Sequence, residues 1–140
     1  MATPRAVPLL GAGVAAAVTM LALDMTWLGP VAHSLYDTIG DLKAPQPNLL
    51  AVVLFYAFYL VAVIVHAVLP SLSIGQSARR GAGLGLVAYG TFDLTCWAVL
   101  RGWPAFLVPI DMGWGVVLTS TVAAVGSAVY LRISGPLATP

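Results

Sequence analysis

Long apolar runs separated by short polar connections set the pattern along this chain. Four runs, residues 6–28, 49–69, 81–100 and 105–131, consist mainly of apolar residues. Each has the ~20 residues that an α-helix needs to cross the hydrocarbon core of a bilayer. The sequence therefore predicts an all-α integral membrane protein, a single domain over residues 1–140 built as a four-helix bundle with short loops.

The connections between these runs predict how the helices are joined and oriented. Residues 29–48 hold three prolines, which predicts a loop with a short interfacial helix near residues 31–42. The first run is longer than a typical signal-peptide core and lacks a small-x-small cleavage site, so we expect an uncleaved first helix. Because cytoplasmic loops carry more Lys and Arg, both termini are predicted to be cytoplasmic. The basic residues on that side are Arg5, Arg79, Arg80 and Arg132, against Lys43 and Arg101 on the other.

Composition agrees with a membrane location and narrows the classes of function. Of the 140 residues, 60% are hydrophobic and 8% are charged, whereas a soluble domain has about 25% charged residues. The net charge is +1 and no basic patch is present, which excludes nucleic acid as an expected partner. The lipid bilayer is the expected environment. Because Cys96 is the single cysteine, no intrachain disulfide can form.

Three aspartates fall inside the predicted spans, where a charged side chain costs from ~2.5 to more than 10 kcal/mol and usually faces the bundle interior. Asp24, Asp93 and Asp111 would lie ~6, ~10 and ~9 Å inside the outer ends of their helices at 1.5 Å per residue. Carboxylates that meet in a low dielectric do not all ionise, so we expect at least one to be protonated. A protonated carboxyl beside an ionised one suits general acid/base catalysis, which makes these three the candidate catalytic residues.

Aromatic side chains lie at comparable depth and predict a ligand pocket around the acids. Tyr89 and Trp97 are four residues before and after Asp93, which places all three near one helix face. Indole N–H groups close to the acids could donate to them, or the rings could line a pocket for an apolar ligand. The candidate ligand-binding residues are Trp27, Tyr56, Tyr59, Tyr89, Thr95, Trp97 and Trp114.

Other residue patterns have simpler interpretations. Gly81 and Gly85 begin a membrane helix and follow no strand, so they predict close helix packing and not a nucleotide loop. His33 and His66 fall near opposite membrane faces and cannot share a metal ion. We therefore expect neither a metal nor a cofactor. The acids themselves could serve only to hold the helices together, and a salt bridge from Arg101 to Asp93 or Asp111 would favour that interpretation.

Several short strings occur in order over nearly the whole chain and resemble one known family. They are Leu23-Asp24 with Trp27-Leu28-Gly29, Tyr56-Ala57-Phe58-Tyr59, Gly85 with Tyr89 to Thr95, and Asp111 with Trp114-Gly115. In these strings the chain resembles domain-of-unknown-function family 2177, a family of small bacterial membrane proteins.

That resemblance implies four spanning helices in a bacterial inner membrane but no established reaction. Members of the family often sit beside genes for fatty-acid modification, which implies a lipid-like substrate. The chain departs from the family pattern at Phe92, where Tyr is usual, and at Cys96, where Asn is usual. Both changes remove a hydrogen-bonding group close to Asp93 in the sequence.

Three hypotheses for function follow. The leading one is a pocket in the outer half of the bundle that binds a hydrophobic or lipid-like small molecule and converts it by acid/base chemistry, although the sequence leaves open whether the protein is an enzyme. The alternative is a small proton-coupled transporter that works as a homo-oligomer, namely a dimer. The third is an accessory membrane subunit whose acids only fix its own packing.

Overall fold

The computed structural model describes residues 6–135, and these residues form helices without any strand. Four helical stretches are long and apolar enough to cross a membrane, Ala6–Val31, Leu49–Val68, Ile74–Val99 and Leu107–Ser134. This confirms the predicted all-α membrane fold. The elements in chain order are α1 (Ala6–Thr26), the π-helix η1 (Trp27–Val31), α2 (His33–Asp37), the 3-10 helix η2 (Gly40–Leu42), α3 (Leu49–Val63), the π-helix η3 (Ile64–Val68), α4 (Ile74–Val99) and α5 (Leu107–Ser134).

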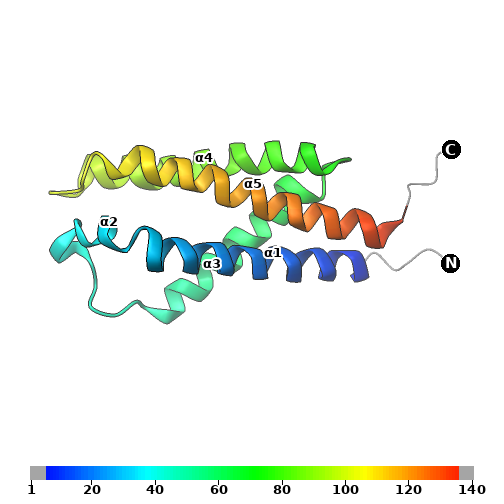
Figure 1. The fold of residues 1–140 in the computed structure, drawn as a ribbon, viewed down its shortest axis with the longest axis horizontal. Coiled ribbons are helices and arrows are strands. Elements are labelled where there is room, and N and C mark those ends of the chain that lie inside the picture. The colour runs from blue at the N-terminus through cyan, green and yellow to red at the C-terminus, as the bar shows by residue number, and fades with distance from the viewer. Residues whose placement is uncertain (1–5, 136–140) are drawn as a thin grey trace.

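Neighbouring spans alternate in direction, as Figure 1 shows. α1 and α4 run one way along the long axis, and α3 and α5 run the other way, so α1 begins where α5 ends. α5 is the central helix, because it packs along both α4 and α1. α3 crosses the others obliquely, and its first half stands away from α1 (Figure 1). We call the end that carries α2 the cavity end, and the end where α1 begins the opposite end.

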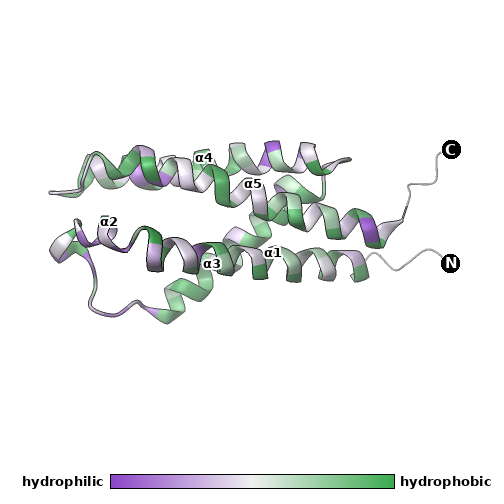
Figure 2. Cartoon of the chain, in the orientation of Figure 1, coloured by the Kyte–Doolittle hydropathy of each residue, from purple (hydrophilic) through white to green (hydrophobic). Residues whose placement is uncertain are grey.

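The surface of the molecule is rich in exposed apolar side chains, as expected for a protein that contacts lipid. Large apolar side chains such as Leu50, Phe58, Leu72 and Val99 are about 70% exposed or more, and Figure 2 shows apolar residues along the length of every span. A surface this apolar is unfavourable in water but matches the hydrocarbon of a bilayer.

Side-chain caps fix where two of the spans begin. Asn48 accepts a hydrogen bond from the Ala51 backbone N–H at 3.2 Å, which starts α3. Ser73 accepts from the Gln76 N–H at 3.2 Å, and Gln76 accepts from the Leu72 N–H at 2.8 Å. This reciprocal arrangement resembles a capping box. As a result α4 begins at Ile74, ahead of the Gly81 expected from hydropathy alone.

The connection after α1 is more helical than its prolines suggested. The chain continues past Thr26 as the π-helix η1, which contains Pro30. A proline has no N–H to donate, and a π-turn is one way a helix accommodates such a defect. The interfacial helix expected near residues 31–42 is divided into α2 and η2, and Gly40 has a φ of +56°, which favours glycine.

Two apolar clusters hold the helices together. The larger cluster joins α1, α3 and α5 through fully buried side chains, among them Ala16, Val63 and Val122. The smaller cluster lies at the cavity end, where Leu107 and Val108 of α5 and Trp103 pack against Leu35 of α2. The smaller cluster therefore fixes α2 against the start of α5.

Glycines bring α4 and α5 into backbone contact. A Cβ atom on Gly81 would lie 2.5 Å from the Thr119 carbonyl oxygen, and one on Gly85 would overlap the Gly115 carbonyl. Real Cβ atoms do not approach that closely, so these positions require glycine. The close helix packing predicted from Gly81 and Gly85 is confirmed.

We expect Gly85→Ala to reduce the free energy of unfolding by ~1–3 kcal/mol, because the added methyl group must push two helix backbones apart. The measurement is thermal unfolding in detergent micelles followed by circular dichroism. Gly83→Ala is the matched control, since nothing lies within 4 Å of a Cβ at Gly83 on the same helix. Equal stability of the two variants would show that α4 and α5 are not in backbone contact.

Candidate functional site

A cavity of about 730 Å³ lies at the cavity end between α1, α3, α4 and α5. Its volume falls within the ~300–1,000 Å³ range of small-molecule sites. Two acids and eight aromatic residues form its wall with six other residues, all apolar. The lining residues are Asp24, Met25, Trp27, Leu28, Tyr36, Pro47, Leu49, Val52, Phe55, Tyr56, Tyr59, Ala88, Tyr89, Phe92, Asp111 and Trp114.

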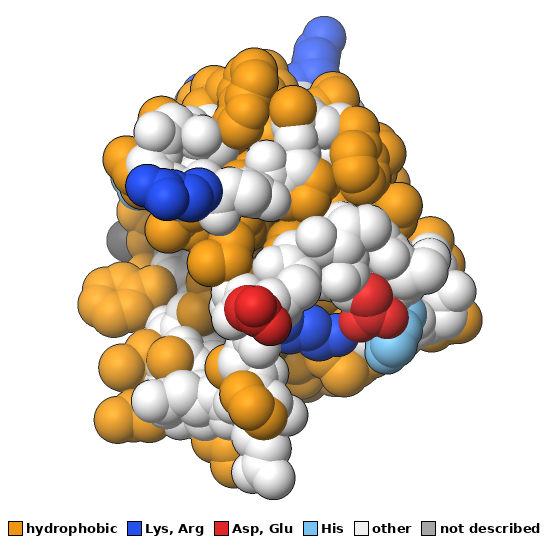
Figure 3. Space-filling view, turned by 90° about the vertical axis from the view of Figure 1, so that its left-hand side faces the viewer, with side chains coloured by type: hydrophobic (Ala, Val, Ile, Leu, Met, Phe, Trp, Pro, Cys, Tyr) orange, Lys and Arg blue, Asp and Glu red, His pale blue; other side chains and the backbone are white. Residues whose placement is uncertain are grey.

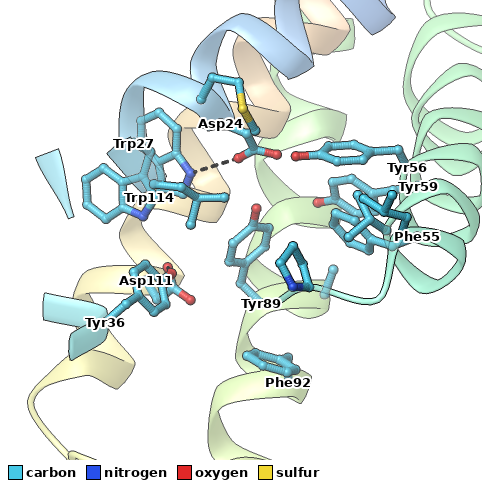
Figure 4. Close-up of a pocket in the computed structure, with 16 residues that line it drawn as sticks. Asp24, Trp27, Tyr36, Phe55, Tyr56, Tyr59, Tyr89, Phe92, Asp111 and Trp114 are labelled. Atoms are coloured by element: carbon cyan, nitrogen blue, oxygen red, sulfur yellow. Dashed lines mark hydrogen bonds between the residues drawn. The ribbon is translucent and has the colours of Figure 1, made fainter. Parts of the chain in front are cut away.

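The oblique course of α3 creates the space for this cavity. α3 contributes Phe55, Tyr56 and Tyr59 to one wall, while the facing wall comes from α1, η1 and α5 (Figure 4). Leu28 and Leu49 line the cavity and are also exposed on the molecular surface. The cavity therefore reaches the surface between the end of the first span and the start of α3, where lipid would surround the protein.

Asp24 is the acid on the α1 side of the cavity. Its side chain is buried, with 5% exposed, and it accepts a hydrogen bond from Trp114 Nε1 at 3.4 Å. The Tyr56 hydroxyl of α3 points toward the same carboxyl group (Figure 4). The Trp114 ring stacks on Trp27 with ring centroids 4.5 Å apart and an interplanar angle of 3°. α1, η1, α3 and α5 thus meet at this carboxyl group.

Asp111 is the acid on the α5 side, and it is 3% exposed. Tyr36 of α2 donates its hydroxyl to Asp111 Oδ1 at 2.5 Å. Burial, and then the hydrogen bond to Asp111, raise the pKa of Tyr36 above its ordinary value, so this phenol remains a proton donor near neutral pH. The contact ties the short helix α2 across the cavity end to α5.

A hydrogen bond closes the inner end of the cavity. Tyr59 and Thr119 hydroxyl oxygens lie 2.7 Å apart, and the Tyr59 ring meets Tyr89 edge-on at a centroid distance of 6.3 Å. Beyond them the fully buried side chains of Val63 and Leu118 fill the bundle. The cavity therefore does not continue toward the opposite end.

Asp93 lies behind the cavity wall and not in it. Its side chain is 0% exposed, and neither carboxyl oxygen has a hydrogen-bond partner within residues 6–135. Arg101 is exposed and forms no ion pair with Asp93 or Asp111 in that part of the chain. Within residues 6–135 no basic residue therefore neutralises Asp93 or Asp111, and a structural role through a salt bridge from Arg101 has no support.

The ion pairs in the described residues lie on the surface of the cavity end, where Figure 3 shows acidic, basic and histidine side chains close together. Asp37 is 2.6 Å from Lys43 Nζ and 3.1 Å from His33 Nδ1. The Lys43 hydrogen bond is the main cause that lowers the pKa of Asp37. These charges are exposed to solvent and separate from the cavity. In residues 6–135, no three His, Cys, Asp or Glu side chains cluster as metal ligands.

The structure brings together most, but not all, of the residues that the sequence singled out. Asp24, Asp111, Trp27, Tyr56, Tyr59, Tyr89 and Trp114 line the cavity. Thr95 and Trp97 lie outside it, and Trp97 is 54% exposed. Each step of four residues rotates an α-helix by about 40° beyond a full turn. Over the eight residues from Tyr89 to Trp97 the two side chains therefore point to different sides of α4.

The sequence interpretation missed several lining residues. Phe55 could have been found, because Val52, Phe55, Tyr56 and Tyr59 follow the spacing of one helix face. Phe92 was noted only as a departure from the family pattern, and it too lines the cavity. No local pattern would have identified Tyr36, since only the fold of the connection brings it to Asp111.

These features define a class of protein, namely a four-helix integral membrane protein with an acidic and aromatic cavity at one end of its bundle. The chain belongs to the DUF2177 family, whose model, described as a predicted membrane protein, matches residues 10–128. The family expected from the sequence is therefore confirmed. No curated protein and no solved structure matches the chain.

We expect Tyr36→Phe to lower stability by ~1–3 kcal/mol, because the buried Asp111 carboxyl loses its donor. Thermal unfolding in detergent micelles measures the change. Tyr130→Phe is the control, since Tyr130 packs against the larger core cluster but its hydroxyl makes no hydrogen bond within residues 6–135.

The same change in an Asp111→Ala background, which lacks the acceptor, separates the hydrogen bond from ring packing. If Tyr36→Phe costs as much there as it does in the native sequence, the phenol does not stabilise the protein through Asp111.

Proposed function

We propose that this protein binds an apolar or amphiphilic small molecule that enters the cavity from the bilayer. The observation that carries the proposal is a cavity of about 730 Å³ with a largely aromatic wall that reaches the surface among exposed apolar residues. A mostly apolar cavity with a few convergent polar groups is the usual form of a small-molecule site. A molecule dissolved in the bilayer would reach it without crossing water.

Asp24 and Asp111 are the polar groups available to such a ligand. A carboxylate can accept about four hydrogen bonds, and the bonds from Trp114 and Tyr36 hold each group in place while leaving further acceptor sites. We extend the proposal to acid/base conversion of the ligand by these two residues. In that role one carboxyl group gives a proton and the other accepts one.

The geometry favours binding over transport. A carrier needs a path that opens in turn to each side, and here the Tyr59–Thr119 hydrogen bond and the core behind it close the inner end. A purely structural role explains why Asp24 and Asp111 connect helices. It does not explain why the bundle keeps a cavity of this size between them, since close packing stabilises a bundle more.

We propose an orientation for the protein in a bacterial inner membrane, with the cavity in the outer half of the bilayer. Arg79, Arg80 and Arg132 are exposed at the opposite end of the bundle. The side with more basic residues usually faces the cytoplasm. The start of α1 and the end of α5 would then be cytoplasmic, which keeps the expectation drawn from the sequence.

Cysteine accessibility tests this orientation. In a Cys96→Ser background, Asp41→Cys should react with a membrane-impermeant maleimide in intact spheroplasts, and Leu72→Cys should react only after lysis. Asp41 lies in η2 at the cavity end, and Leu72 lies before α4 at the opposite end, both exposed. The reverse labelling pattern would place the cavity in the cytoplasmic half.

Filling the cavity should abolish ligand binding. Val52 lines the cavity, so we expect Val52→Trp to remove the small molecule that the native protein retains through purification in detergent. Val53→Trp is the matched control, because Val53 is next in the chain, does not line the cavity and is 63% exposed.

Mass spectrometry of extracts from the purified proteins measures the retained molecule per chain. We expect about one molecule per chain for the native protein and for Val53→Trp, since the cavity has the size of a single-ligand site. Equal retention by Val52→Trp would show that the cavity is not the binding site.

A further inference from the structure

The charges around the cavity restrict the chemistry of its ligand, provided that the proposed binding function holds. Asp24 and Asp111 both line it, and no Lys, Arg or His does so in the part of the chain that the structure describes. Two acids that share a low-dielectric space repel a third negative charge and attract a positive one. The lining therefore disfavours an anionic head group, including a free fatty-acid carboxylate.

No basic residue of the described chain is placed to supply the missing positive charge. Lys43 is paired with Asp37 on the surface. Arg101 is exposed in the connection before α5. His33 is likewise paired with Asp37 at the cavity end. The other basic side chains of the described chain, including His66, lie toward the opposite end. A compensating charge at the two acids would have to come from the ligand.

The aromatic wall is suited to the same kind of ligand. Trp27 and Trp114 form a stacked pair beside Asp24, and the rings of Tyr56 and Tyr89 lie around the same space (Figure 4). Aromatic faces attract organic cations through their electron-rich π systems, and the attraction is stronger where water is excluded. Two acids enclosed by aromatic rings thus offer both charge neutralisation and cation–π contact.

A second, smaller cavity lies beside the first, at the seam between α1 and α3. It has a volume of about 130 Å³ and shares Tyr56 with the main cavity. Its other lining residues are all apolar, Ala17, Met20, Leu21, Ala57 and Leu60. From Asp24 to Ala17 the helix rises by about 10 Å. This seam therefore offers an apolar surface next to the part of the main cavity wall that Tyr56 forms.

From these features we infer that the ligand class is a lipophilic organic cation, such as a quaternary ammonium or phosphonium compound or an alkyl amine. Its charged centre lies between Asp24 and Asp111, and its apolar part lies against the aromatic wall and the seam between α1 and α3.

Two probes of similar size and opposite charge test the inference. Isothermal titration measures binding of tetraphenylphosphonium and of tetraphenylborate to the purified full-length protein in neutral maltoside micelles. We expect the native protein to bind the phosphonium. Titration into protein-free micelles corrects for partition of each probe. After this correction the native protein should bind the borate more weakly than the phosphonium.

Single variants show whether the two acids hold the charge. Asp24→Asn and Asp111→Asn should each weaken phosphonium binding by about tenfold or more, because a bound cation favours the ionised form of both acids and each variant removes one carboxylate. Asp41→Asn is the matched control, since it removes the same charge from an exposed residue outside the cavity and should bind as the native protein does.

The comparison of the two probes on the native protein needs no variant, so misfolding of an Asn variant would not leave the question open. Failure of the native protein to bind the phosphonium, or equal binding of the borate, would overturn the inference. In that case binding of dodecanol, a neutral amphiphile, would show that the cavity still accepts a small molecule. Loss of dodecanol binding as well would remove the proposed binding function.

Discussion

The cost of burying carboxyl groups within a bilayer is the constraint on which the cavity end of this protein depends. A carboxyl group in a medium of low dielectric is stabilised by donors or by a counter-charge. Asp24 and Asp111 obtain donors from other helices, Trp114 of α5 for the first and Tyr36 of α2 for the second. Each acid therefore joins two elements, and α5 takes part in both pairs. The same contacts that satisfy the acids also set the positions of α1 and α2 around the cavity.

The helices pack differently at the two ends of the bundle. At Gly81 and Gly85 the backbones of α4 and α5 touch, and the core beside α1 and α3 is closed mainly by small and branched side chains. At the cavity end α3 carries the large rings of Phe55 and Tyr59 and diverges from α1, whereas Tyr89 of α4 packs directly against Gly115 of α5. The change in side-chain size along the helices thus produces a closed half and a half with a cavity.

Much of this arrangement could be predicted from the sequence because it depends on local patterns. Apolar runs of sufficient length predicted the four spans, and the spacing of Gly81 and Gly85 predicted where two helices touch. Depth along each helix placed Asp24 and Asp111 at one end, since depth depends only on the rise per residue.

The features that the sequence could not predict depend on how each helix is rotated about its axis and on the irregular connections between the helices. Depth does not say which way a side chain points, so Asp93 and Trp97 were grouped with Tyr89 although Asp93 lies behind the cavity wall and Trp97 faces outward. Tyr36 was missed because it lies in the connection between spans. Only the path of α2 and the packing of Leu35 against the start of α5 bring it to Asp111.

The three intramembrane acids are consequently not equivalent. Asp24 and Asp111 line the cavity and can touch a ligand, whereas Asp93 is fully enclosed and can act on a ligand only through its neighbours. Phe92, the residue before Asp93, lines the cavity and packs edge-on against Trp103, with ring centroids 5.8 Å apart. The Phe92 position therefore affects the cavity wall more directly than it affects Asp93. Any chemistry in the cavity depends first on Asp24 and Asp111, although Asp93 is the single acidic residue of α4.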